Sequence, residues 1–392
     1  MITGTTVGIG ILGLPIKTGL AGVLPSFVAT IAVWGVMLGT GLVVARGIMA
    51  ADDRTIDIST LVYQRLGVPG RVMTVVGYLV LVYGIITAHL AAGGEVLAVL
   101  TGGALSANKA ILLFFVAATI IALLGVSLVE KINSVLMGVL FVSFCAILVE
   151  AAKSVDASRF APQDWRFLAA TVPIIVCALT YQLIIPSVCR MLDNDSKAVT
   201  KAVIIGTLIP VALNTLWMLA VVGALPLAGE GGNTILAAFH AGQPATVPLA
   251  ATLQSEAFRR FVLVFSLVVL VSSYVLQSTA VIGFFEDLLP AGLGRKRTAS
   301  AVLGFVPPLA VVYLYPGIFL KALDVIGGGS VILLFGIIPS LMLLKDEAAS
   351  GSGIRIRVLA VGLLLVSLLF MGLEIMQEFG FLRIAPNVEY WF

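Results

Sequence analysis

The sequence predicts an all-α integral membrane protein with about eleven membrane-spanning helices. Of the 392 residues, 60% are hydrophobic and only 11% are charged, whereas a soluble domain carries roughly a quarter charged residues. The apolar residues stand in long runs, which have to face lipid or one another. Two of these runs, near 2–20 and 168–188, are also interrupted by residues that weaken a helix.

Eleven runs approach the roughly 20 apolar residues that a spanning helix needs. They lie near 2–20, 24–45, 72–100, 109–128, 132–150, 168–188, 199–223, 260–285, 299–315, 318–343 and 356–378. Membrane strands are excluded because the runs are too long and do not alternate between apolar and polar residues. The 40 glycines are typical of membrane helices that pack closely. We therefore expect a single transmembrane domain over residues 1–392.

The loops predict the orientation and two short additional helices. With a cytoplasmic N-terminus, the inside loops hold more lysine and arginine than the outside loops, as the positive-inside rule requires. We expect a multi-pass protein of the cell inner membrane with an external C-terminus. Residues 50–70 are typical of a short amphipathic cytoplasmic helix, and residues 226–258 of an external cap with one or two short helices.

The first apolar run is broken by glycine and proline. Its residues 4–15 read GTTVGIGILGLP, and each glycine costs a helix up to about 1 kcal/mol relative to alanine, while proline removes a backbone donor. Unwound backbone survives in lipid only where it is buried in protein or lines a polar cavity. Only three residues precede Gly4, so we expect the cytoplasmic half of this helix to be nearly absent from the chain.

The sixth run is interrupted at a matching place, where residues 179–187 read LTYQLIIPS. Five runs separate the two starts, so residues 1–150 and 165–343 are expected to form two halves of inverted topology, followed by an extra helix at 355–380. Broken helices at matching places in inverted halves indicate a transporter site near the midplane. The alternative is that the glycines serve close packing alone.

An α-amino acid suits such a pair of breaks. Free N–H groups at a half-helix N-terminus attract a carboxylate, and freed carbonyls attract an ammonium group or a cation. The predicted substrate-binding residues come from both breaks. They are Gly4, Thr5, Thr6, Gly8, Gly10, Thr180, Tyr181 and Gln182.

These residues resemble those of the hydroxy- and aromatic-amino-acid permeases, the bacterial tyrosine- and tryptophan-specific transporters of the amino acid–polyamine–organocation superfamily. The run at 4–15 looks like that family's first-helix signature. Further motifs occur in the same order at 93–97 (GGEVL), 125–130 (GVSLVE), 185–187 (IPS), 305–309 (FVPPL), 315–316 (YP) and 338–341 (IPSL). The resemblance implies a leucine-transporter-like fold of five plus five helices, and symport of an aromatic amino acid with a cation, usually the proton.

Two departures from the family pattern concern substrate and ion. The sixth-helix break of the family usually carries aromatic-glycine-aromatic-histidine, whereas this chain has LTYQ, with Gln182 at the histidine position. Some relatives carry a lysine within the fifth helix, where this chain has Leu140. The resemblance therefore leaves open which aromatic amino acid is carried and whether the ion is H⁺ or Na⁺.

Three residues are the predicted ion-coupling groups. Glu95 lies within the third-helix motif, and an ionisable side chain at membrane depth is a functional candidate; its alternative is a carboxylate solvated by the external vestibule. Ser272 and Ser273 offer oxygen ligands on helix 8, although such hydroxyls also join helix to helix. Lys17 is interpreted as reaching the membrane interface, and Asp324 as either a gate residue or a solvated carboxylate.

Other function classes lack their sequence features. The chain has only two histidines and neither a His-Glu-x-x-His nor a Gly-x-Ser-x-Gly pattern, so an enzyme, a metal site and a cofactor are not expected. The net charge of +3 is too small to indicate nucleic acid. We expect an aromatic L-amino acid and membrane lipid as partners, with no obligatory protein partner. The alternative function is an amino-acid-sensing receptor subunit on the same fold without net transport.

Overall fold

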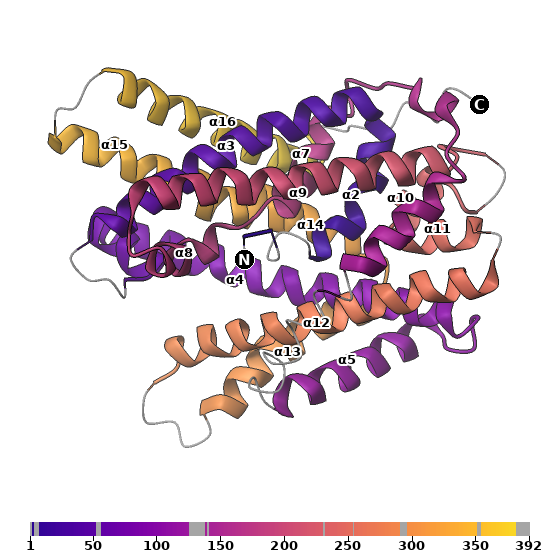
Figure 1. Cartoon of the computed structure of the whole chain (residues 1–392). Helices are drawn as coiled ribbons and strands as arrows, with labels where there is room; N and C mark the ends of the chain where they lie inside the picture. The colour runs from indigo at the N-terminus through magenta and orange to yellow at the C-terminus, as the bar shows by residue number, and fades with distance from the viewer. Residues whose placement is uncertain are drawn as a thin grey trace.

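The computed structural model describes residues 2–3, 8–51, 56–124, 138, 141–229, 232–253, 255–290, 296–350 and 354–381, without the side chains of 124 and 347–350. Within these residues, eight helical stretches are long and apolar enough to cross a membrane. They are α3 (Val23–Met49), α4 (Ile58–Leu100), Leu168–Met191, α9 (Ser196–Ala224), α12 (Glu256–Leu288), α13 (Lys296–Leu314), Phe319–Asp346 and α16 (Ile354–Glu378). Figure 1 shows the long helices running roughly along one direction, side by side.

The three other predicted runs also contain helices. α2 (Ile9–Ala21), α5 (Ala107–Leu124) and the helix Phe141–Ala152 are shorter apolar helices. The predicted motif at 125–130 and the first half of the run at 132–150 lie outside the described residues, apart from 138. Each of the eleven predicted runs thus corresponds to a helix in the part of the chain that the structure describes.

Both predicted additional features are present. The amphipathic segment begins at Ile58, where the Asp57 side chain accepts a hydrogen bond from the backbone N–H of Thr60. It bends at Gly67, whose φ of 70° favours glycine, before α4 continues into its long apolar part. The cap consists of two short helices, α10 (Ile235–Ala241) and α11 (Thr246–Thr252). We call the end of the bundle that carries them the α10–α11 face.

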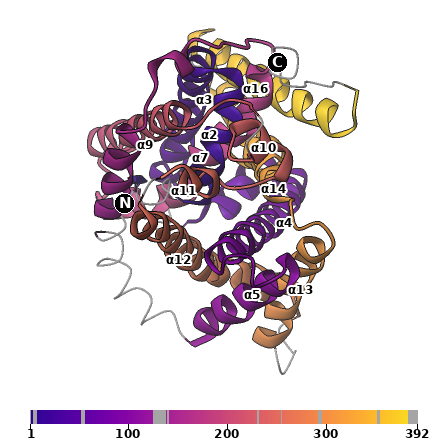
Figure 2. The same cartoon turned by 90° about the vertical axis from the view of Figure 1, so that its right-hand side faces the viewer.

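The two broken helices stand at the centre of the bundle. Viewed from the α10–α11 face in Figure 2, α2 and α7 (Leu168–Ala178) lie inside a ring that includes α3, α4, α9 and α12, while α5, α13 and α16 lie further out. α2 packs on α7 and α9, and α3 packs on the same two helices. α4 packs on α5, α12 and α13. The described helices therefore form two packed groups, and both broken helices belong to the group that contains α3 and α9.

Prolines inside the helices leave carbonyl groups that a neighbouring helix can use. Proline has no N–H, so the carbonyl four residues earlier loses its helical partner, and in lipid it needs another donor. In α13, Pro307 frees the carbonyl of Leu303, and the hydroxyl of Tyr83 on α4 donates to that oxygen at 3.0 Å. The same arrangement occurs at the first break.

Candidate functional site

The first break ends at Gly8. This residue has an extended backbone (φ −137°, ψ −150°) and precedes α2, which begins at Ile9. Residues 2 and 3 are again helical. Gly8 and Gly10, two of the predicted binding residues, therefore lie at the start of a half-helix. Gly4, Thr5 and Thr6, which we also predicted, lie outside the described residues.

The second break separates α7 from α8 (Ile185–Met191). α7 ends at Ala178, Tyr181 has a non-helical backbone (φ −142°, ψ −7°), and a single 3-10 turn covers Gln182–Ile184. The predicted interruption of the sixth run is confirmed. The break contains both polar residues and Pro186. Proline is favoured in the first turn of a helix, so Pro186 marks the start of α8.

The two breaks touch each other at Gly10. A Cβ atom placed on Gly10 would lie 2.8 Å from the backbone Cα of Ala178, the last residue of α7. Real Cβ atoms do not approach backbone this closely, so only glycine permits the contact. The structure thus brings together the helix ends on which the predicted binding site depends.

The polar side chains of the second break bind backbone carbonyls of α7 and α3. The hydroxyl of Thr180 donates to the Val176 carbonyl of its own helix at 2.8 Å. Tyr181 and Gln182 reach α3, where the Tyr181 hydroxyl and the Gln182 amide both donate to the carbonyl of Met37, at 3.1 and 3.2 Å. These side chains fasten the break to α3, and the Tyr181 hydroxyl lies against Gly41, where no larger residue fits.

Helix α9 supports the first break through a tryptophan. Pro15 inside α2 frees the carbonyl of Ile11, and the indole N–H of Trp217 donates to that oxygen at 2.8 Å. Trp217 is almost fully buried. The hydrogen bond is made possible by the proline one turn after Ile11.

A second contact joins α9 to the other side of the break. Pro210 frees the carbonyl of Gly206, and the Thr3 hydroxyl donates to it at 3.2 Å. Asn214 lies on α9 between this contact and Trp217. Its side chain is 2% exposed, and both of its amide atoms lack a hydrogen-bond partner among the described residues. An unpaired buried amide beside a helix break suits a polar ligand.

A cavity opens between α4 and α12 on the side opposite the α10–α11 face. Its volume is about 350 Å³, and its lining includes Tyr78, Leu183, Gln277, Phe284 and Asp287. Leu183 belongs to the 3-10 turn of the second break, so the cavity extends to the broken helix. At the opposite end the cap is joined to α2, where the backbone N–H of Ala245 donates to the Leu12 carbonyl at 2.7 Å.

The predicted ion-coupling residues make separate contacts. Glu95 on α4 accepts a hydrogen bond of 2.6 Å from the side chain of Gln243 in the cap. The Ser272 hydroxyl donates within α12 to the carbonyl of Val269 at 3.0 Å, and Ser273 beside it is half-buried. Their part in ion coupling stays a prediction.

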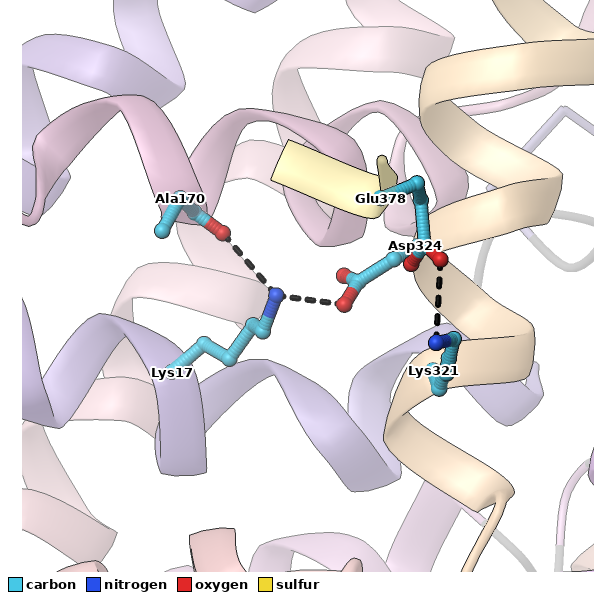
Figure 3. A network of polar contacts seen from close by, with 5 residues as sticks. All are labelled: Lys17, Ala170, Lys321, Asp324 and Glu378. Atoms are coloured by element: carbon cyan, nitrogen blue, oxygen red, sulfur yellow. Dashed lines mark hydrogen bonds and ion pairs between the residues drawn. The ribbon is translucent and has the colours of Figure 1, made fainter. Parts of the chain in front are cut away.

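The structure reveals a buried ion pair that the sequence interpretation missed. Lys17 is 6% exposed and does not reach the interface; its ammonium group contacts Asp324 Oδ2 at 2.5 Å and donates to the Ala170 carbonyl at 3.1 Å (Figure 3). Asp324 is 8% exposed, so it is not a solvated carboxylate. The pair joins α2, α7 and α14 (Phe319–Asp324). Opposite charges in two membrane helices were the available signal, since such residues usually pair.

Comparisons with known proteins agree with this geometry. A sequence model described as the tryptophan/tyrosine permease family matches residues 1–377. The chain is 27% identical to the tyrosine-specific transport system 2 of Haemophilus influenzae over 83% of this chain and 82% of that protein. It is 25% identical to the tryptophan-specific transport protein of Shigella flexneri over 90% of this chain and 86% of that protein.

Two solved structures show the same fold. MhsT in complex with L-phenylalanine superposes with a TM-score of 0.63 at 15% identity, covering 94% of this chain and 97% of that one. A manganese transporter of Eremococcus coleocola superposes with a TM-score of 0.59 at 15% identity, covering 99% and 88% of the two chains. The predicted leucine-transporter-like fold is confirmed.

Proposed function

This chain belongs to the tryptophan/tyrosine permease family, and on that basis we propose that it is a secondary active transporter that imports an aromatic amino acid such as tyrosine or tryptophan. The observation that carries the proposal is the contact between the two broken helices at Gly10 and Ala178. A broken helix is tolerated in lipid where it lines a cavity or a site. Because the two breaks are in contact, the free backbone N–H and C=O groups of both helices are available at one place.

The start of α2 suits the carboxylate of an amino acid. The first N–H groups of a helix have no helical partner and carry the positive end of its dipole. Gly8 and Gly10 carry no side chain at this terminus, and no atom of the described residues lies within 4 Å of a Cβ placed on Gly8. Asn214 adds an unpaired amide on the neighbouring helix. These features support Gly8, Gly10 and Asn214 as substrate-binding positions.

The cavity between α4 and α12 supports a conformation that is open to one side. With the N-terminus in the cytoplasm, as the basic residues indicate, the α10–α11 face is external and the cavity opens to the cytoplasm. Its volume of about 350 Å³ leaves room for an amino acid on its way from the second break. In alternating access, the group formed by α2, α3, α7, α8 and α9 rocks against the group around α4 and α12.

Symport with a cation, with the proton preferred over sodium, completes the proposal. In proteoliposomes, we expect an inwardly directed proton gradient, with the outside more acidic, to raise the accumulation of labelled tyrosine, tryptophan or phenylalanine several-fold above the level reached without a gradient. The same experiment with an imposed sodium gradient is the control for the ion. If neither gradient changes accumulation, the symport claim fails, whereas a response to sodium alone moves the coupling to the other ion.

A further inference from the structure

Five ionisable side chains from α2, α14 and α16 lie close together near the α10–α11 face. Lys17 and Asp324 form the buried pair described above. Lys321 and Glu378 form a second, more exposed pair with a distance of 3.0 Å between nitrogen and oxygen (Figure 3). The fifth group is Glu374 on α16, which is 6% exposed. Three carboxylates thus face two ammonium groups, and the fully ionised cluster carries one uncompensated negative charge.

Two carboxylate groups in this cluster have unused hydrogen-bonding capacity. The ammonium group of Lys17 binds Asp324 Oδ2, but Asp324 Oδ1 is buried and has no partner. Glu374 forms no hydrogen bond or ion pair with another described residue. Its side chain lies over Gly328, where an added Cβ would be 2.5 Å from Glu374 Cγ. An ionised carboxylate that is buried without a partner costs several kcal/mol, and one added proton removes that cost.

We propose that Asp324 and Glu374 form a proton-binding site, filled by one proton from the aqueous phase at the α10–α11 face, and that this proton is required for α2 to pack against α14. The proton forms an O–H bond with one carboxylate oxygen, and the cluster becomes neutral. This inference rests on the proposed function, because it identifies the residues of this chain that respond to the coupling proton. Asp324 and Glu374 replace Glu95 as the first candidates for the residues that bind the coupling proton.

The placement of the charges on different helices links the proton to a change of conformation. Lys17 belongs to α2, in the group that holds both breaks, whereas the carboxylates belong to α14 and α16. When α2 moves away from α14, the ion pair separates and water reaches the carboxylates, which then ionise. Closure buries them again and requires the proton. Ligands that bind the same conformation favour each other's binding, so acid pH should strengthen amino-acid binding from this face.

The neighbours of the site define which other groups must be considered. The charged groups that act on Glu374 lie on α2, α14 and α16. The Cys177 thiol of α7 interacts with Asp324 and is included with them. These groups are Lys17, Lys321, Asp324, Glu378 and Cys177. Lys321 and Glu378 pair with each other at the exposed edge, and both count in the charge balance of the cluster.

The test measures the apparent affinity for labelled tyrosine at the α10–α11 face, in proteoliposomes, between about pH 5.5 and 8.5. For the unmodified protein, we expect affinity to fall on the alkaline side by up to about tenfold per pH unit, the limit for one linked proton. Glu374→Gln mimics the protonated form, so its affinity should stay within about twofold over the whole range. Glu256→Gln, which removes an exposed carboxylate that pairs with Arg260 on α12 and lies outside the cluster, should keep the pH dependence of the unmodified protein.

A glycine pair provides a second test if Glu374→Gln does not fold. Gly328→Ala displaces the Glu374 side chain and should shift the midpoint of the pH profile, while Gly329→Ala, which meets no atom of a described residue within 4 Å, should not. A Glu374→Gln protein that retains the pH dependence, or a Gly328→Ala protein with an unchanged midpoint, overturns the proposal. Exchange of amino acid by those same variants would show that the transport function stands nevertheless.

Discussion

Replacing Lys17 by methionine is expected to destabilise the protein by about 3–5 kcal/mol, because it leaves the Asp324 carboxylate buried without its counter-charge. The ammonium group of Lys17 is the only ion-pair partner of Asp324 among the described residues, and both residues are more than nine-tenths buried. Methionine fills a similar volume but brings no charge. The loss is measured as a lower midpoint of thermal unfolding of the purified protein in detergent, together with reduced uptake.

The reciprocal and double variants separate the charge from the packing. Asp324→Asn alone leaves the Lys17 ammonium group buried and should also destabilise. The double variant with both changes should recover most of the stability, since no uncompensated charge remains. Arg65 and Asp346 form an ion pair that is about one-third exposed, so Arg65→Met should cost no more than about 1 kcal/mol. If Lys17→Met proves as mild as Arg65→Met, the buried pair does not stabilise the packing of α2 against α14.

The second large effect is expected at Gly10. Changing Gly10 to valine should reduce uptake to background, because its Cβ would lie 2.8 Å from the Ala178 backbone and would force the two broken helices apart. Overpacking of this kind typically costs about 1–3 kcal/mol, and here it also displaces the proposed binding groups. Uptake of labelled tyrosine, normalised to the amount of protein in the membrane, measures the loss.

Gly8 is the matched control for Gly10. Within the part of the chain that the structure describes, no atom lies within 4 Å of a Cβ placed there, and its φ of −137° is open to any residue. Gly8→Ala should therefore fold normally, whereas a bulky residue at Gly8 should fill the proposed site and abolish binding. A Gly8→Trp protein that binds tyrosine with unchanged affinity would move the site away from the first break.

Local sequence features predicted the helices and both breaks. Glycine, proline and polar residues act within one or two turns, so the interruptions at Gly8 and Tyr181 could be found without knowing the partner helices. The directions of side chains could not. Tyr181 and Gln182 were expected to contribute to the substrate site, yet their polar atoms reach Met37 on α3. The backbone path through the break determines where such side chains point.

Pairing between distant residues was likewise beyond sequence reasoning. Lys17 and Asp324 are 307 positions apart, and each alone fits an ordinary membrane-interface residue. Glu374 lies in the predicted extra helix and was not among the predicted site residues. Only the packing of α16 on the glycines near Gly328 places this carboxylate inside the protein. The helices were thus predictable one by one, whereas the charge cluster depends on their assembly.

Counterflow in proteoliposomes tests the central claim most directly, because it requires the binding site to face both sides of the membrane in turn. Vesicles loaded with unlabelled tyrosine or tryptophan and diluted into a trace of labelled tyrosine should take up the label transiently, far above vesicles without protein. The Gly10→Val variant should remain at the level of the empty vesicles. Saturable binding of labelled tyrosine without such exchange would contradict transport and would indicate an amino-acid sensor on the same fold.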